Sequence, residues 1–402
     1  MPFSELQLQL DERAARGLLR QRRTVFSPQQ PQLVVDGKSY LSFCSNDYLG
    51  LANNSSLINA LQNGAAEWGA GAGAAHLVSG HFAPHEQLEQ ELAAFVGKPA
   101  AVLFSTGYMA NLGVVQALVG RGDTVFADKL NHASLNDAML LSRANVKRYR
   151  HNDMAQLSDL LEKTVDGRKL ICTDAVFSMD GDFAPLPELL ALCEQYDAWL
   201  LVDDAHGFGV VGEQGRGSLS HFATPTLTFP LEGGVNKGKN TFNSSRIIYM
   251  ATLGKAAGVF GAFVAAESVV INYIINQSRS YVYTTATPPA LSVALRESLR
   301  LIREGDELRA HLQRLILQLK AGLADLPWTL MPSDTAIQPL LIGENQAALA
   351  LSLALREKGI WVAAIRPPTV PDGTARLRIT LSASHTSNDV QRLLEALHEL
   401  AG

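Results

Sequence analysis

The middle of the chain alternates short apolar runs with longer amphipathic stretches. Seven runs are strand candidates: AAVLFS (100–105), TVFAD (124–128), VKRYR (146–150), KLICTDAV (169–176), WLLVDDAH (199–206), RIIYMATL (246–253) and GAFVAA (261–266). Helical periodicity fills the intervals at 133–143, 154–163 and 185–196. Because strands that alternate with helices favour parallel pairing and right-handed crossovers, the pattern predicts an open three-layer α/β sheet.

The two ends of the chain have a different pattern. The first hundred residues predict an N-terminal helix, a hairpin around VVDGKSYLSF (34–43) and, after a glycine-rich stretch, a helix over 85–95. After residue 290 one long amphipathic helix is expected to about residue 323, and a smaller alternation of strands (336–343, 361–366, 375–382) with helices follows. We therefore expect an N-terminal segment (1–45), a large domain (46–290) and a smaller α+β domain (291–402).

Composition and charge remove several classes of function. The chain has 402 residues, of which 47% are hydrophobic and 18% charged, and this is typical of a large globular core. A formal net charge of -5 gives no basic field for nucleic acid or anionic lipid. No apolar stretch approaches the ~18 residues that a membrane span needs. We expect a small molecule or another protein chain as partner, and neither nucleic acid nor a membrane.

The three cysteines and the N-terminal residues indicate the cellular compartment of the protein. Cys44, Cys172 and Cys193 have no metal-ligand spacing, which favours a reduced, cytoplasmic environment and no metal site. Five arginines between residues 13 and 23 stand beside Asp11 and Glu12. This mixture of basic and acidic side chains predicts the solvent-exposed face of a helix, in preference to a targeting signal.

Polar side chains follow two of the predicted strands. Asp203, Asp204 and His206 close one strand, and Lys255 follows the next in MATLGKAAGVFGAF (250–263). Alone, the first group also fits a loop cap, and the lysine fits a side chain whose head reaches water. Together they suit pyridoxal phosphate: a poorly solvated lysine supplies a neutral amine for an aldehyde, and a carboxylate keeps a pyridine nitrogen protonated.

Two further segments offer contacts for such a cofactor. LFSTGYMANLGVV (103–115) predicts a strand, a turn and a helix N-terminus, where the backbone N–H groups of Gly107 and Tyr108 would face a phosphate. In DKLNHASLNDA (128–138), His132 begins a helix. Its imidazole suits either stacking on an aromatic cofactor or a polar cap.

Seven motifs occur in a fixed order along nearly the whole chain: FCSNDYLGL, FSTGYMANLG, LNHASLNDA, VFSMDGDFAPL, VDDAHGFGVVGEQGRGS, TLGKAAG and YTTATPPA. In these motifs the chain resembles the α-oxoamine synthase family of fold type I pyridoxal phosphate enzymes. The resemblance implies a large domain with a three-layer, mostly parallel sheet and a smaller α+β C-terminal domain. It also implies a pyridoxal phosphate-dependent acyltransferase that condenses an amino acid with an acyl thioester and releases carbon dioxide.

The same resemblance implies roles for single residues. Lys255 would hold the cofactor aldehyde and act as general base, Asp203 would pair with the pyridine nitrogen, and His132 would stack on the ring. His206 would contact the phenolic oxygen. The other cofactor contacts that it implies are Gly107, Tyr108, Ser178, Thr252 and, contributed across a homodimer with shared active sites, Thr284 and Thr285. The substrate contacts that it implies are Arg20 (with Arg22 or Arg23 as alternatives), Thr369 and Arg378.

The segment AIRPPTVPDGTARLRITLSASH (364–385) is similar to the branch of the family that uses L-alanine and a pimeloyl thioester, on coenzyme A or acyl carrier protein, in biotin biosynthesis. Glycine C-acetyltransferase and 5-aminolevulinate synthase share the cofactor motifs and stay alternatives. A non-catalytic paralogue is a further alternative, which the presence of Lys255 and Asp203 disfavours.

Three features depart from the family pattern. The segment 219–246 is about twenty residues longer than the corresponding segment in the family, and we expect it to be a solvated surface loop. Phe208 stands where the family has a smaller, hydroxyl-bearing residue, and Phe260 stands where it has a serine. We expect both rings to add bulk close to the site.

Overall fold

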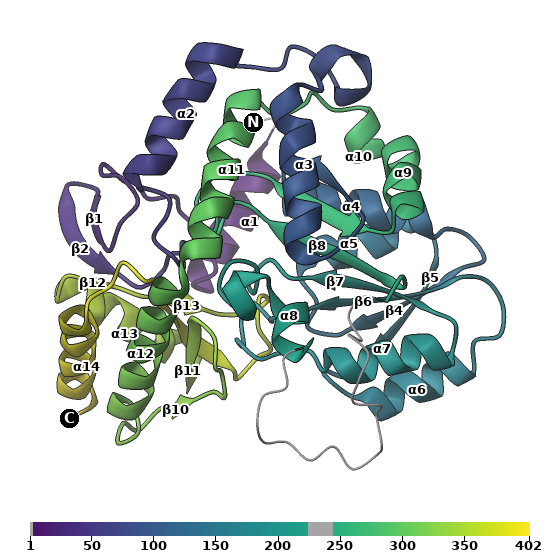
Figure 1. Ribbon diagram of the computed structural model, residues 1–402. Coiled ribbons are helices and arrows are strands. Elements are labelled where there is room, and N and C mark those ends of the chain that lie inside the picture. The colour runs from purple at the N-terminus through teal and green to yellow at the C-terminus, as the bar shows by residue number, and fades with distance from the viewer. Residues whose placement is uncertain (1–2, 224–243) are drawn as a thin grey trace.

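The computed structural model describes residues 3–223 and 244–402 (Figure 1). Within 219–246, predicted to be a surface loop, residues 219–223 belong to helix α8 (Ser218–Ala223), and residues 224–243 lie outside the described part of the chain. None of the helices in the described ranges is long and apolar enough to cross a membrane.

The seven predicted strands all form the central sheet. They are β3 (Ala100–Phe104), β4 (Thr124–Asp128), β5 (Asn145–Tyr149), β6 (Lys169–Asp174), β7 (Trp199–Asp203), β8 (Ile247–Thr252) and β9 (Ala262–Ala266). Their order in the sheet is β3-β9-β8-β7-β6-β4-β5. Only β9 runs antiparallel to its neighbours, and the other pairs are parallel. The expected α/β fold with a mostly parallel sheet is confirmed.

Alternate side chains along the strands face two separate cores, so helices cover both faces of the sheet (Figure 1). In β4, for example, Phe126 packs into one core and Val125 and Ala127 pack into the other. The first face is covered by α3 (Ala83–Val96), α6 (Met154–Glu162), α7 (Leu186–Gln195), α8 and α11 (Pro289–Glu304). The second is covered by α4 (Gly107–Leu118), α5 (Ala133–Ser142), α9 (Ser268–Gln277) and α10 (Arg279–Val282). Three layers result.

The single long helix expected up to residue 323 is two helices. α11 ends at Glu304, α12 (Asp306–Gly322) begins at Asp306, and Gly305 separates them. Glycine is a poor helix former, and a Cβ at Gly305 would lie 2.8 Å from the carbonyl oxygen of Leu301. The hydrophobic periodicity continues on both sides of this break, which is why the pattern alone predicted one helix.

The C-terminal part carries a four-stranded antiparallel sheet in the order β10-β11-β14-β13. Its strands are β10 (Thr329–Leu330), β11 (Ile337–Gly343), β13 (Ala363–Ile365) and β14 (Ala375–Thr380), and its helices are α12, α13 (Asn345–Glu357) and α14 (Ser387–Ala401). Leu340 and Leu377 of the sheet pack into the same core as Leu393 of α14. This is the α+β unit that the sequence predicted.

The N-terminal segment contributes a third small sheet. After the exposed helix α1 (Ser4–Ala15), β1 (Gln32–Val35) and β2 (Lys38–Ser42) form the predicted hairpin, with Asp36 and Gly37 at positive φ in its two-residue turn. β2 also pairs in parallel with β12 (Ile360–Trp361). Helix α2 (Ser55–Trp68) and a π-helical turn (His76–Gly80) follow the hairpin. The three-part division of the chain stays a prediction.

Candidate active site

Five strands bring functional side chains to one edge of the central sheet. β3, β4, β6, β7 and β8 all point the same way, so their carboxyl ends lie along the same edge. The residues that follow these ends are Gly107 after β3, His132 after β4, Ser178 after β6, His206 after β7 and Lys255 after β8, while Asp203 and Thr252 are the last residues of β7 and β8. The fold therefore gathers seven of the predicted residues.

Lys255 lies at the centre of this group. Its Nζ is 2.8 Å from Nε2 of His206, whose Nδ1 is 2.6 Å from the hydroxyl of Tyr48. Burial lowers the pKa of Lys255 to about 8, against the opposing charges of Asp203 and Asp174. Burial also keeps the pKa of His206 well below its usual value, so this imidazole is neutral. Since an ammonium group only donates, Nε2 accepts from it and Nδ1 donates to Tyr48.

The two adjacent aspartates have different tasks. Asp203 is 4% exposed; its Oδ2 accepts a hydrogen bond from Nδ2 of Asn111 at 2.7 Å, and its Oδ1 accepts from the N–H of Ala205 at 3.0 Å. Asp204 accepts from the backbone and hydroxyl of Ser218 at 2.7 and 2.6 Å and from the hydroxyl of Tyr249 at 2.8 Å. Asp203 alone is therefore held by groups of the site, whereas Asp204 braces the loop beyond it.

His132 both caps a helix and lines a cavity. Its ring Nδ1 accepts a hydrogen bond from the backbone N–H of Ser134 at 3.2 Å, at the start of α5. The backbone N–H of His132 donates to Oδ2 of Asp174 at 2.7 Å. Burial lowers the pKa of His132, while the charge of Asp203 opposes this shift. The ring borders a cavity of about 700 Å³, together with Ser178. The cap foreseen as one alternative is observed, and stacking on a cofactor stays a prediction.

Two of the three predicted substrate residues line the cavity beside His132. Arg20 and Thr369 line this cavity and a neighbouring one of about 720 Å³. Arg23, an alternative to Arg20, instead pairs with Asp36 at 3.0 Å. Arg378 is buried, and its guanidinium donates to the carbonyl oxygen of Ser178 at 2.6 Å and to Oδ1 of Asn46 at 3.2 Å. A role of Arg378 in binding a carboxylate stays a prediction.

Comparison with known proteins identifies the family. Residues 38–397 match the model of the aminotransferase class I and II family. This chain belongs to that family. Its curated relatives include the 8-amino-7-oxononanoate synthases of Nitrosospira multiformis (60% identical, covering 97% of this chain and 94% of the relative) and Dechloromonas aromatica (57% identical, covering 98% and 99%).

Solved structures agree with this membership of the aminotransferase class I and II family. Serine palmitoyltransferase from S. paucimobilis, with a bound PLP–myriocin aldimine, superimposes with a TM-score of 0.89 at 27% identity over 99% of this chain and 97% of that chain. The 8-amino-7-oxononanoate synthase from Francisella tularensis has a TM-score of 0.75 at 31% identity, over 90% and 97%. The chain is accordingly an enzyme with pyridoxal phosphate as its cofactor.

The residues at the start of α4 are suited to bind the phosphate group of pyridoxal phosphate. Oγ1 of Thr252 is buried and has no hydrogen-bond partner among the described residues. A Cβ at Gly107 would lie 2.6 Å from Cγ2 of Thr252, so only glycine leaves this space open. The helix begins here with free N–H groups and a favourable dipole. Tyr108, also predicted to face the phosphate, is 42% exposed and donates its hydroxyl hydrogen to Asp137.

Thr284 and Thr285 lie in the segment between α10 and α11. Thr284 is half-buried, Thr285 is exposed, and neither is among the described residues that line the cavity beside His132. The N–H of Ala286 donates to the carbonyl oxygen of Ala74 at 2.9 Å, which joins this segment to the glycine-rich stretch 71–81. A role in the active site of a partner subunit stays a prediction.

The expectation that Phe208 and Phe260 crowd the site is wrong for the first of them. The ring of Phe208 is fully buried and packs edge-on against Phe95 and Phe263, at centroid distances of 5.9 and 5.2 Å. Its bulk therefore fills the hydrophobic core beneath the loop. Phe260 is 47% exposed and is not among the described residues lining the two cavities.

Sequence reasoning missed several groups that hold this family's site together. Tyr48 and Asn46 lie in FCSNDYLGL, a motif that carried no assigned role, and they contact His206 and Arg378. Asn111 lies one helical turn after Gly107, on the side of α4 that faces Asp203. The spacing of four residues from Gly107 was the available signal for Asn111.

A histidine cluster was also unexpected in a chain predicted to bind no metal. Nitrogen atoms of His76, His81 and His85 lie within 4.8 Å of one another. His85, however, accepts from the N–H of Phe82 at 3.0 Å through Nδ1 and donates to the carbonyl oxygen of Thr287 at 2.8 Å through Nε2. Both of its ring nitrogens are thus occupied, and the cluster acts as a hydrogen-bonded cap of α3.

Proposed function

We propose that this enzyme is an 8-amino-7-oxononanoate synthase. It condenses L-alanine with a pimeloyl thioester and yields 8-amino-7-oxononanoate, the free thiol of the carrier and carbon dioxide, a step of biotin biosynthesis. The observation that carries this proposal is the buried group Lys255–His206–Tyr48 beside Asp203, in a chain 54–60% identical over almost its full length to curated enzymes of that name.

The residues of the site divide the chemistry between them. When bound, pyridoxal phosphate supplies an aldehyde that takes up the amino group of the substrate and a ring that accepts electron density from its Cα. The Nζ of Lys255 holds that aldehyde and, once released, takes the proton from Cα of alanine. Its lowered pKa of about 8 gives a substantial neutral fraction near that pH. His206, 2.8 Å away, fixes the position of Nζ.

Asp203, His132 and Arg378 have the remaining roles in the proposed reaction. The carboxylate of Asp203 holds a proton on the pyridine nitrogen, and Asn111 and Ala205 orient it through their hydrogen bonds. His132 covers the ring and excludes water from that face. We propose that Arg378, which donates to Asn46 in the structure, binds a substrate carboxylate in a bidentate way instead.

A substrate screen on cofactor-loaded enzyme tests the proposed reaction. We expect release of free thiol from pimeloyl-coenzyme A with L-alanine, and rates lower by at least about a hundredfold with glycine and acetyl- or succinyl-coenzyme A, since a missing methyl group and a shorter chain each remove contacts. Pimeloyl-acyl carrier protein, assayed in parallel, identifies the natural carrier. Turnover of glycine with acetyl-coenzyme A, and none of alanine with the pimeloyl thioester, would assign the chain to a different branch.

We also propose a homodimer with shared active sites, in which Thr284 and Thr285, which do not line the cavity beside His132 of their own chain, act in the site of the partner subunit. Mixing Lys255→Ala chains with Thr284→Ala/Thr285→Ala chains tests it by subunit exchange. If the threonines act across the interface, half of the random dimers regain one complete site, and activity returns to about a quarter of wild type. Activity that stays at the level of the separate variants would place the threonines in their own chain's site.

We place the enzyme in the cytoplasm. Thioesters of coenzyme A and acyl carrier protein are cytoplasmic substrates, and Cys44, Cys172 and Cys193 are all free thiols.

A further inference from the structure

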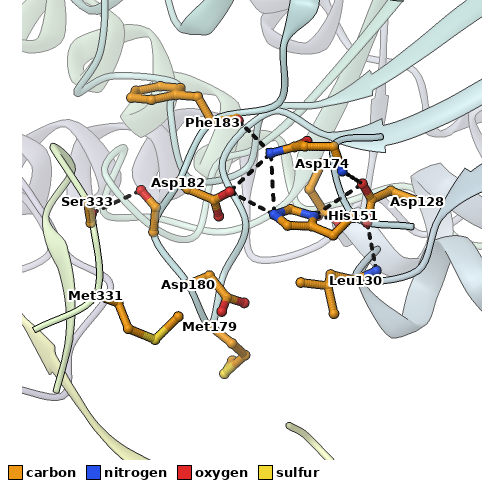
Figure 2. A network of polar contacts seen from close by, with 12 residues as sticks. Asp128, Leu130, His151, Asp174, Met179, Asp180, Asp182, Phe183, Met331 and Ser333 are labelled. Atoms are coloured by element: carbon orange, nitrogen blue, oxygen red, sulfur yellow. Dashed lines mark hydrogen bonds and ion pairs between the residues drawn. The ribbon is translucent and has the colours of Figure 1, made fainter. Parts of the chain in front are cut away.

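His151 joins two loops of the active site, and none of the steps above uses it. It lies two residues beyond the end of β5. Its Nδ1 is 3.1 and 3.2 Å from the two carboxylate oxygens of Asp128, and its Nε2 is 2.7 Å from Oδ2 of Asp182 (Figure 2). Asp128 precedes His132 by four residues, and Asp182 follows Ser178 by four. The imidazole thus bridges the loop after β4 and the loop after β6.

The bridge requires a charged imidazole. A neutral ring carries one N–H donor, whereas the two carboxylates need one each. Burial alone would lower the pKa of His151, but the hydrogen bonds and charges of Asp128 and Asp182 outweigh it and raise this pKa to about 10. The ring also packs edge-on against Phe177, at a centroid distance of 4.4 Å. One cation therefore lies between two carboxylates that would otherwise repel each other.

Each carboxylate also fixes its own loop. Asp128 accepts from the N–H of Leu130 at 2.8 Å, in the turn that leads to His132, and from the N–H of Asn152 at 2.8 Å. The side chain of Asn152 donates to Oδ2 of Asp182 and to the carbonyl oxygen of Phe183, both at 3.2 Å. The turn before His132 and the end of the Ser178 loop are thereby held to the same imidazole.

The Ser178 loop is also held from its other side. Asp180 pairs with Arg376 of β14 at 2.6 Å, and both side chains are largely buried. The hydroxyl of Ser333 donates to the carbonyl oxygen of Gly181 at 2.9 Å (Figure 2). The C-terminal part thus fixes one side of the loop, and His151 fixes the other.

We propose that His151 is a positioning residue for the reaction: by donating to Asp128 and Asp182 it fixes the loop that carries His132 against the loop that carries Ser178. The inference rests on the proposed function in one respect, that these two loops border the cofactor. His151 itself touches neither cofactor nor substrate and acts through the loops.

The variants His151→Gln, Asp182→Asn and their combination test this role. A glutamine side chain donates from a single nitrogen and carries no charge, so it cannot bridge both carboxylates, the two loops move apart and His132 shifts. We expect a changed circular dichroism of the bound cofactor in the visible range, a cofactor dissociation constant raised about tenfold and a raised KM for L-alanine. Because both single variants break the same bridge, the double variant should add little to either one. Arg150→Gln is the matched control, since Arg150 is the preceding residue and pairs with Asp153 at the surface.

A merely structural role gives a different result. His151→Gln would then lower the midpoint of thermal unfolding, while the visible circular dichroism, the cofactor dissociation constant and the KM stay at wild-type values, and this would overturn the proposal. If His151→Gln does not fold, Asp182→Asn decides by the same three measurements. Cofactor affinity and dichroism are measured without substrate, so failure of the proposed reaction, seen as an inactive wild type, is distinguishable from failure of this inference.

Discussion

Replacing Lys255 with alanine will lower turnover at least about a thousandfold, because the change removes the covalent anchor of the cofactor and the general base together. The amine lies 2.8 Å from Nε2 of His206 and has a pKa lowered by burial to about 8, so none of the described neighbours offers an equivalent group. The measurement is twofold: thiol release from pimeloyl-coenzyme A, and the visible absorption band of the purified protein, which this variant should lose.

Lys98→Met is the matched control for this prediction. Burial lowers the pKa of Lys98 to about 8 as well, and its Nζ donates to the carbonyl oxygen of Ser244 at 3.1 Å. Lys98 precedes β3, however, and so lies at the opposite edge of the sheet. We expect this variant to keep both the absorption band and the turnover. A Lys255→Ala protein that retains either of them would contradict the assignment.

Replacing Asp203 with asparagine will lower kcat by about a hundredfold to a thousandfold while the cofactor stays attached to Lys255. An amide cannot hold a proton on the pyridine nitrogen as a carboxylate does, so the ring withdraws electrons from Cα less strongly. The amide oxygen can keep the hydrogen bond from Asn111 at 2.7 Å, while the amide nitrogen cannot accept the one that Asp203 receives from the N–H of Ala205. Steady-state kinetics, together with the visible spectrum of the resting enzyme, check this prediction.

Replacing the adjacent Asp204 with asparagine is the control for this prediction. Asp204 accepts three hydrogen bonds from Ser218 and Tyr249, whereas Asp203 accepts from Asn111 and Ala205. Asp204→Asn should reduce the free energy of unfolding by about 1–3 kcal/mol and leave kcat within a few-fold of wild type. If Asp204→Asn were as inactive as Asp203→Asn, the division of tasks between the two aspartates would be wrong.

Much of the fold followed from local patterns. All seven strands of the central sheet overlap the predicted runs, and their alternation with helices was enough to predict a mostly parallel sheet. The position of Lys255 and Asp203 followed in turn, because carboxyl ends of parallel strands meet at one edge. A site residue can be located from the sequence when it closely follows the apolar run that forms its strand, as Lys255 and Asp203 do.

The parts that escaped prediction depend on contacts between distant segments. Tyr48 reaches His206, and His151 bridges Asp128 and Asp182, through hydrogen bonds that no local spacing encodes. Phe208 was expected to crowd the site because it stands where the family has a smaller residue, yet its ring turns into the core. Position along the chain located the loop, but the direction of a side chain within it is decided by packing.

The pairing of β2 with β12 has a consequence for how the molecule is assembled during synthesis. Leu41 lies beside Ile360, so the hairpin at the beginning of the chain acquires its third strand only after the ribosome has made nearly the whole protein. Contacts between residues so far apart raise the contact order and slow folding. Until then one edge of β2 is unpaired, and an unpaired strand edge of a nascent chain is prone to aggregation.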